Sequence, residues 1–134
     1  MKPLVLGALG VMWLACSSCS NRDADLPAAY RDIPVPEQQL AAPGARQRGR
    51  QLFLEHCALC HGDQADGKGV RREGLSRAPR DFTSMAWRQS TSPRHVYFAI
   101  REGVRGTPMP SWKALDDRDI WDLVAYVLSV GAPS

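Results

Sequence analysis

We predict from the sequence a small all-α domain in which a few short helices are joined by loops. Residues 116–130 show helical periodicity, because apolar side chains recur at i, i+3, i+4, i+7 and i+8. No segment shows a convincing alternation of apolar and polar residues, as a half-buried strand would. Ten prolines and eleven glycines in 134 residues favour loops over long regular elements. The length allows one compact domain with appendages.

Residues 1–19 are typical of an export signal peptide. Lys2 precedes an apolar run from Leu4 to Ala15, and this run is too short to cross a bilayer as an ordinary helix. Small residues follow the run at once, as they do at a cleavage site. We therefore expect the mature protein to be periplasmic or otherwise extracytoplasmic.

The motif LACSSC at residues 14–19 resembles the lipobox at which bacterial lipoproteins are cleaved and acylated. Trp13 stands where a leucine is usual, so Cys16 and Cys19 are both candidates for acylation. Acyl chains on one of them would anchor the protein to the membrane, since stable attachment takes more than one chain. Cleavage to a soluble form and an exported disulfide stay open as alternatives.

Residues 20–43 are predicted to form a proline-rich linker between the anchor and the domain. The segment has four prolines, charges of both signs and no sustained periodicity. Tyr30 and Ile33 are able to pack on the domain that follows, but most of the segment is expected to act as a tether.

The charge pattern argues against binding of nucleic acid. The formal net charge is +3, and from Gly44 onward fourteen Arg or Lys residues stand against ten Asp or Glu residues. The cations are mixed with acids and lack the interleaved aromatic residues of a nucleic-acid surface.

The segment CALCH at residues 57–61 carries the chemistry. Two thiols three residues apart, Cys57 and Cys60, lie on nearby faces of one helical turn and are able to form thioether bonds with two vinyl groups of a porphyrin. His61, which follows at once, is then placed as the proximal ligand of the iron. We therefore expect one covalent haem c. The pair Cys16 and Cys19 is followed by serine rather than histidine, so it does not add a second haem.

Other uses of a C-x-x-C pair fit this chain less well. A structural zinc site needs four ligands, and the domain has no second cysteine pair. A thioredoxin-like redox pair would occur in a βαβ pattern, which the sequence lacks.

Met109 is the predicted second axial ligand of the iron. It lies in the segment GTPMP at residues 106–110, where two prolines stiffen the loop that presents its thioether. A histidine–methionine pair suits haem iron and raises its reduction potential. Met85 and His95 are the rivals for this position, and His56 is poorly placed because the next residue is an attached cysteine.

Two further helices have start and stop signals. Asp116 or Asp117 is able to cap the last helix. Another helix is expected to begin near Thr91 or Ser92 and to stop at Gly103. The domain is therefore expected to consist of short helices that enclose a flat apolar cofactor.

Residues 44–132 resemble a class I cytochrome c domain, in which short helices wrap around one covalently bound haem. The segment GRQLF (49–53) matches the first helix of that family, and LVAY (123–126) matches its last helix. The resemblance implies that these helices cross, with contacts among Gly49, Phe53, Leu123 and Tyr126.

The resemblance also implies two further haem contacts. Pro79 is similar to the family proline whose carbonyl accepts a hydrogen bond from the proximal histidine, which would fix the orientation of His61. Trp87 either donates its indole N–H to a haem propionate or is a core aromatic residue.

We expect this protein to transfer single electrons between a redox donor and a redox acceptor, since two filled axial positions leave iron no site for substrate. Similar domains are carriers or subunits of respiratory oxidase and nitrogen-oxide reductase systems. A haem enzyme or a gas sensor would need a displaceable sixth ligand, and rapid binding of carbon monoxide would indicate one.

Overall fold

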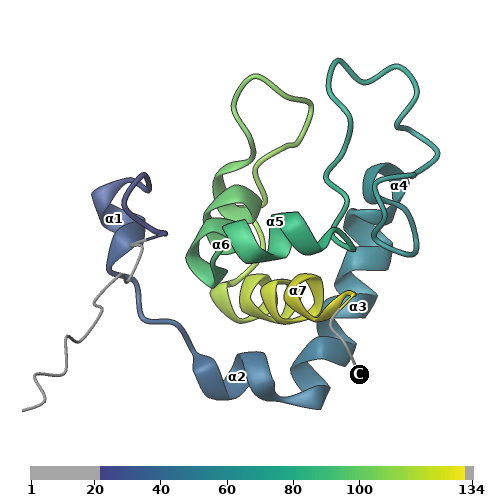
Figure 1. Cartoon of the computed structure of the whole chain (residues 1–134). Helices are drawn as coiled ribbons and strands as arrows, with labels where there is room; N and C mark the ends of the chain where they lie inside the picture. The colour runs from purple at the N-terminus through teal and green to yellow at the C-terminus, as the bar shows by residue number, and fades with distance from the viewer. Residues whose placement is uncertain (1–21, 132–134) are drawn as a thin grey trace, which may run out of the picture.

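The computed structural model describes residues 22–131, which form helices and no strand, so the predicted all-α class is confirmed (Figure 1). The predictions for residues 1–19, with the lipobox cysteines, lie outside the described residues. None of the described helices is long and apolar enough to cross a membrane. The helices are α1 (Ala28–Arg31), α2 (Glu37–Ala41), α3 (Pro43–His56), α4 (Ala58–His61), α5 (Met85–Ser90), α6 (Pro93–Glu102) and α7 (Asp117–Ser129).

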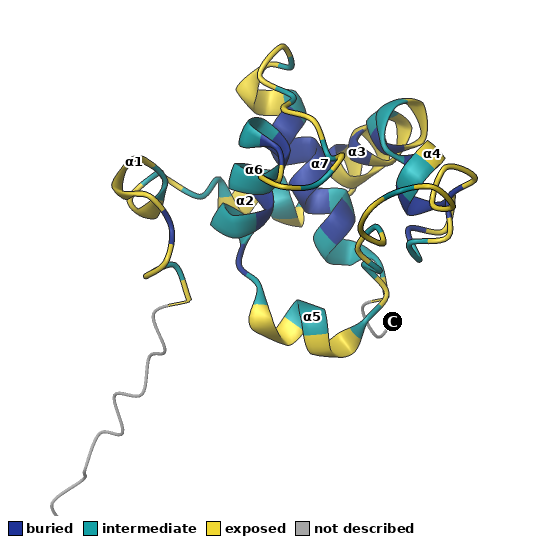
Figure 2. Cartoon of the chain, turned by 90° about the horizontal axis from the view of Figure 1, so that it is seen from above, coloured by how far each residue is buried: buried dark blue, intermediate teal, exposed yellow. Residues whose placement is uncertain are grey.

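Helix α7 lies at the centre of the core. Asp116 caps its start, because the Asp116 carboxylate accepts a hydrogen bond from the backbone N–H of Asp119 at 2.8 Å. Its apolar stripe is buried, and Ile120 and Val124 are completely so. Figure 2 shows that the buried residues gather on α3, α6 and α7, whereas α5 is largely exposed.

Helix α6 follows the predicted start and stop signals. The Ser92 hydroxyl accepts a hydrogen bond from the backbone N–H of His95 at 3.2 Å, and Pro93 is the first helical residue. Gly103 ends the helix with φ +74°, a conformation that favours glycine. The buried side of α6 packs against α7, and the loop that carries Met109 leaves from its end.

Helix α3 crosses α7 at Gly49. A Cβ added at this glycine would lie 1.9 Å from the backbone oxygen of Asp122 and 2.9 Å from the Cβ of Tyr126. Only a glycine permits this approach of the two helices. The Phe53 ring packs beside the Tyr126 ring, with centroids 5.1 Å apart. The predicted crossing of the first and last helices of the domain is therefore confirmed at these residues.

A buried carboxylate joins three helices at the same place. Asp122 on α7 is fully buried and accepts hydrogen bonds from Arg48 Nε on α3 at 2.6 Å and from Gln39 Nε2 on α2 at 2.8 Å. Because a buried charge needs partners, these contacts fix the position of α2 and α3 on α7.

Part of the segment predicted as a linker contacts the domain, including Tyr30, which was expected to be able to do so. Within residues 22–42, Leu26 is buried, and the Tyr30 ring makes an edge-on contact with Phe98 of α6 at 4.7 Å. Asp23 forms an ion pair with Arg94 of α6 at 2.9 Å. This part of the predicted tether therefore packs on the domain, because Tyr30 and Asp23 contact residues of α6.

The Gly49 contact gives the first prediction. Replacing Gly49 by alanine should lower the free energy of unfolding of the holo-protein by about 1–3 kcal/mol, because the clash is with backbone and the helices must separate. Gly44, also in α3, is the matched control, since an added Cβ there meets only the Arg48 side chain at 3.5 Å. Thermal unfolding of both alanine variants measures the effect. A melting temperature for Gly49→Ala equal to that of the wild type would contradict the close crossing.

Candidate functional site

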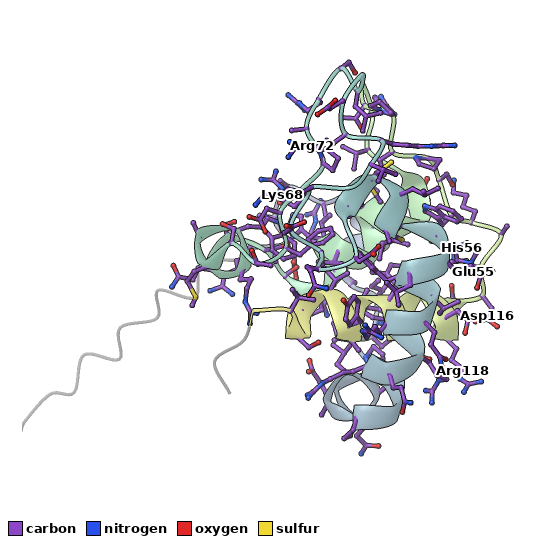
Figure 3. All side chains as sticks on the ribbon, turned by 90° about the vertical axis from the view of Figure 1, so that its right-hand side faces the viewer. Glu55, His56, Lys68, Arg72, Asp116 and Arg118 are labelled. Carbon is purple, nitrogen blue, oxygen red and sulfur yellow. The ribbon has the colours of Figure 1, made fainter. Side chains whose placement is uncertain are left out.

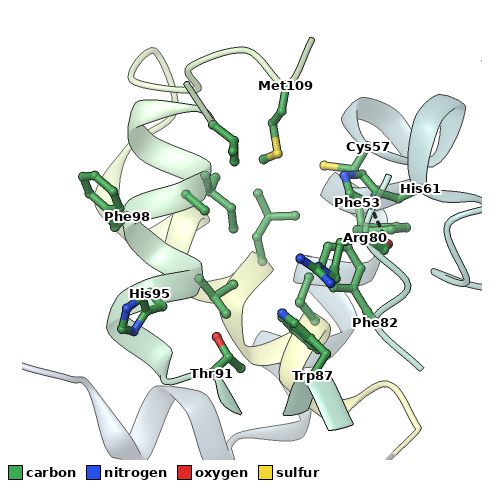
Figure 4. A pocket seen from close by; sticks show the side chains of 16 residues that line it. Phe53, Cys57, His61, Arg80, Phe82, Trp87, Thr91, His95, Phe98 and Met109 are labelled. Carbon is green, nitrogen blue, oxygen red and sulfur yellow. Dashed lines mark hydrogen bonds between the residues drawn. The ribbon is translucent and has the colours of Figure 1, made fainter. Parts of the chain in front are cut away.

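The core contains two adjoining cavities of about 300 and 530 Å³. They share five lining residues, Cys57, His61, Arg80, Val104 and Met109. Their volumes are in the range of small-molecule and cofactor sites, about 300–1,000 Å³. Cys57, His61 and Met109, which the sequence predicts to bind the haem, thus line the same space (Figure 4).

The turn between α3 and α4 places the two thiols and the imidazole. Cys57 ends α3, and its backbone oxygen accepts a hydrogen bond from the backbone N–H of His61 at 2.9 Å, so α4 turns tightly over residues 58–61. Cys57 lines both cavities and Cys60 lines the larger one. Neither thiol is in a disulfide. Burial raises the pKa of the Cys57 thiol to about 12, and the nearby Cys60 contributes to this shift.

His61 is fixed on two sides. Its Nδ1 atom lies 3.1 Å from the backbone oxygen of Arg80, and its ring stacks on Phe82 with centroids 4.7 Å apart. Burial lowers the pKa of His61, while the Arg80 carbonyl acts in the opposite direction. A neutral ring that donates Nδ1–H to this carbonyl keeps the lone pair on Nε2, as a metal ligand requires.

The carbonyl that contacts His61 corrects one prediction. Pro79 was expected to supply it, but in the structure Arg80 supplies it, one residue later. The Pro79 carbonyl oxygen lies close to Gly67 instead, where an added Cβ would be only 2.8 Å from it. Pro79 still lines the larger cavity.

Met109 reaches the cavities from a closed loop. The Thr107 side chain accepts a hydrogen bond from the backbone N–H of Met109 at 3.2 Å, and the backbone N–H of Trp112 bonds the oxygen of Ile100 at 3.0 Å. Figure 4 shows the Met109 sulfur pointing into the cavity, across from the side that carries Cys57 and His61. A soft sulfur and an imidazole nitrogen therefore face the same apolar space from different segments.

The rivals of Met109 are placed less well. Met85 is 52% exposed and lines neither cavity. His95 lines the smaller cavity, but its Nε2 lies 2.9 Å from Asp25 and its Nδ1 lies 3.0 Å from the Ser92 hydroxyl. Both ring nitrogens of His95 thus have partners outside the iron site. His56 lines the larger cavity, and its ring lies tilted against Trp112, with centroids 5.0 Å apart.

Two donors besides the predicted ligands are turned toward the smaller cavity. Figure 4 shows the Trp87 indole nitrogen and the Arg80 guanidinium directed into it. Trp87 also packs on Phe82, with centroids 4.9 Å apart, so it is both a core aromatic and a cavity donor. Sequence reasoning missed Arg80 and Phe82. Their only signal was their position within three residues after Pro79.

These residues fit a haem c. The walls of the smaller cavity are mostly apolar, as a porphyrin face requires, and include Phe53, Ile100, Leu123 and Val127. The thiols, the imidazole and the thioether are donors that suit covalent attachment and iron. Within residues 22–131 no cluster of three or more His, Cys, Asp or Glu side chains is arranged to hold a metal ion, which gives no support to the zinc alternative.

Comparisons with known proteins identify the family and the cofactor. The family described as cytochrome c oxidase, cbb3-type, subunit III, matches residues 44–127. A cytochrome c-553-like protein of Synechocystis is 33% identical over 95 residues, which cover 70% of this chain and 77% of that protein. The cbb3-type cytochrome c oxidase subunit FixP of Rhizobium meliloti is 33% identical over 125 residues, covering 83% of this chain and 40% of that protein.

Longer proteins contain a similar segment. Thiosulfate dehydrogenase of Stutzerimonas stutzeri is 26% identical over 122 residues, which cover 90% of this chain but 37% of that protein. Among solved structures, a reducing HAO-like protein complex of Kuenenia stuttgartiensis matches with a TM-score of 0.61 and 32% identity, over 66% of this chain and 44% of that chain. The chain thus spans well under half of several relatives. It belongs to the family of cytochrome c oxidase, cbb3-type, subunit III, and is a c-type cytochrome domain with one covalently bound haem.

Proposed function

We propose that this chain is an extracytoplasmic electron carrier, or the carrier subunit of a respiratory complex, with histidine–methionine ligation of its haem. The observation that carries the proposal is that His61 and Met109 line the same two cavities although they come from different segments. Family membership and the similarity to cbb3-type oxidase subunits support a respiratory role. The donor, the acceptor and any larger complex belong to the proposal.

Each residue of the site has a separate task. Cys57 and Cys60 would hold the haem by thioether bonds, and His61 Nε2 and Met109 sulfur would be the axial ligands. When bound, haem supplies a reversible one-electron change of its iron. Arg80 keeps the His61 ring in one tautomer through its carbonyl, and Phe82 limits rotation of the ring. The apolar walls exclude water from the ligands.

A pair of protein ligands favours a carrier over an enzyme. A catalytic haem needs an open position beside acid–base groups. Two histidines besides His61 line the two cavities. His95, in the smaller cavity, has its nitrogens engaged by Asp25 and Ser92, and His56, in the larger one, lies against the Trp112 ring. The thioether of Met109 points into the space that a substrate would need.

Replacing Met109 tests this ligand set. In Met109→Ala, the reduction potential should fall by on the order of 100 mV, part of the roughly 0.8 V range that axial ligands set. The reduced variant should also bind carbon monoxide rapidly, because one axial position is open. The matched control is Met85→Ala, whose exposed side chain lines neither cavity. Potentiometric titration followed through the visible spectrum measures both variants. An unchanged potential in Met109→Ala would refute the proposed ligand.

Phe82 provides a test of how His61 is positioned. Phe82→Leu keeps an apolar side chain but removes the ring that stacks on His61, so it should destabilise the holo-protein by about 1 kcal/mol and shift its potential. Tyr30→Leu is the control, because the Tyr30 ring contacts Phe98 and lines neither cavity. Both should lower the melting temperature, but only the first should move the potential. Equal potentials for the two variants would leave Phe82 with a packing role alone.

Membrane anchoring is a separate proposal that rests on the sequence. The lipobox-like residues 14–19 support acylation of Cys16 or Cys19 after export. Mass spectrometry of the mature N-terminus should find a fragment that begins at one of these cysteines and carries acyl chains. An unmodified N-terminus beyond Ser20 would show that the protein is released without an anchor.

A further inference from the structure

Residues 23–33 form a strap beside α6 (Figure 1). At one end of the strap, Asp23 pairs with Arg94 of α6 at 2.9 Å. At its other end, the backbone oxygen of Ile33 accepts a hydrogen bond from Arg94 Nε, also at 2.9 Å. Leu26, between these two ends in the chain, is buried. Both ends of the strap are therefore attached to the first turn of α6.

Tyr30 connects the strap to the opposite end of α6. Its ring packs on Phe98 with centroids 4.7 Å apart, and its O–H donates a hydrogen bond to the Glu102 carboxylate. Burial and the Glu102 carboxylate raise the pKa of Tyr30, so its hydroxyl stays a donor at neutral pH. Glu102 is the last residue of α6, and the Met109 loop, residues 103–112, begins directly after it.

Glu102 also closes the base of the Met109 loop. Its Oε2 atom lies 2.6 Å from Nζ of Lys113, the residue that follows the loop, while its Oε1 atom accepts the hydrogen bond from Tyr30. Lys113 and then Tyr30 lower the pKa of Glu102, which is therefore ionised at neutral pH. One carboxylate thus joins the strap to both ends of the loop that presents Met109.

The contacts inside the Met109 loop are local. Thr107 Oγ1 donates a hydrogen bond to the Val104 oxygen at 2.7 Å and accepts one from the Met109 N–H at 3.2 Å. The loop is therefore a compact unit, and moving it away from the iron requires motion at its base. The Glu102 carboxylate and Lys113 meet at that base, beside the backbone hydrogen bond from the last residue of the loop to α6.

We propose that Glu102 is a positioning residue for Met109, because it binds Tyr30 and Lys113 at once and so slows the departure of Met109 from the iron. This inference rests on the proposed histidine–methionine ligation. Because the two contacts share one carboxylate, each holds that carboxylate in place for the other. The strap thereby links the segment that follows the proposed membrane anchor to an axial ligand of the redox centre.

Binding of carbon monoxide measures the departure of Met109. In the reduced holo-protein, carbon monoxide binds the iron only after Met109 leaves, so the binding rate reaches a plateau at high carbon monoxide concentration. Stopped-flow absorbance should show this plateau raised about three- to fivefold in Glu102→Ala and Lys113→Met, as expected for the loss of a partly exposed ion pair. Tyr30→Phe, which keeps the ring, should raise it about twofold. Lys113→Arg, which keeps the cation, should not raise it.

Two matched controls remove the same groups elsewhere. Lys68→Met removes a cation from an ion pair with Asp66 at 3.8 Å, on the loop after α4. Figure 3 shows Lys68 well apart from Asp116, which is three residues after Lys113 in the chain. Tyr126→Phe removes a hydroxyl from α7 and keeps the ring. Lys68 and Tyr126 line neither cavity, so both variants should keep the wild-type plateau.

The shared carboxylate allows a sharper test. The double variant Tyr30→Phe/Glu102→Ala should have the plateau of Glu102→Ala alone, because the Tyr30 hydroxyl then has no carboxylate to bind. Potentiometric titration of Tyr30→Phe should give the wild-type potential, because Met109 stays bound in nearly all molecules. A wild-type plateau in Tyr30→Phe or Lys113→Met, or one raised equally by Lys68→Met, would overturn the proposal.

The wild-type protein distinguishes failure of this inference from failure of the proposed ligands. If the binding rate rises in proportion to carbon monoxide without a plateau, the iron has an open position. The histidine–methionine ligation then fails, and this inference fails with it. If the plateau is present but the Glu102 and Lys113 variants leave it unchanged, only the positioning role of Glu102 fails.

Discussion

The fold depends on filling the space between α4 and the Met109 loop. The walls of the smaller cavity, of about 300 Å³, are mostly apolar, and without the haem they would be in contact with water. A small domain has too small a core of its own to leave such a surface uncovered without losing stability. The haem is therefore part of the core as well as the redox centre. The Gly49 contact places α3 and α4 on one side of this space, and α6 with its loop closes the other.

The regular part of this fold was predictable because its signals are local. Asp116, Ser92 and Gly103 set helix ends through side chains or φ values that act within a few residues. For residues 22–42, the sequence indicated that Tyr30 and Ile33 are able to pack on the domain, but it did not indicate their partners or the ion pair of Asp23. Asp23 forms an ion pair with Arg94, and the Tyr30 ring contacts Phe98; both partners lie about seventy residues later in the chain. Neither contact leaves a periodic pattern in a proline-rich segment.

The site likewise contains residues that a local motif predicts and residues that only the structure identifies. C-x-x-C-H is a motif because one helical turn fixes the relation of its three side chains, and the paired prolines mark Met109. The contacts that orient His61 come from an irregular loop, where a shift of one residue exchanges Pro79 for Arg80. The close approaches at Gly67 and Gly69 set that loop, and sequence alone does not distinguish such glycines from those in ordinary turns.

The ligand set at the iron is the central claim, and X-ray absorption at the iron edge tests it most directly. The account predicts one sulfur among the nearest neighbours of the iron, with nitrogens in the remaining positions, in both the oxidised and the reduced holo-protein. A coordination shell of nitrogen alone, or iron with five neighbours, would contradict it.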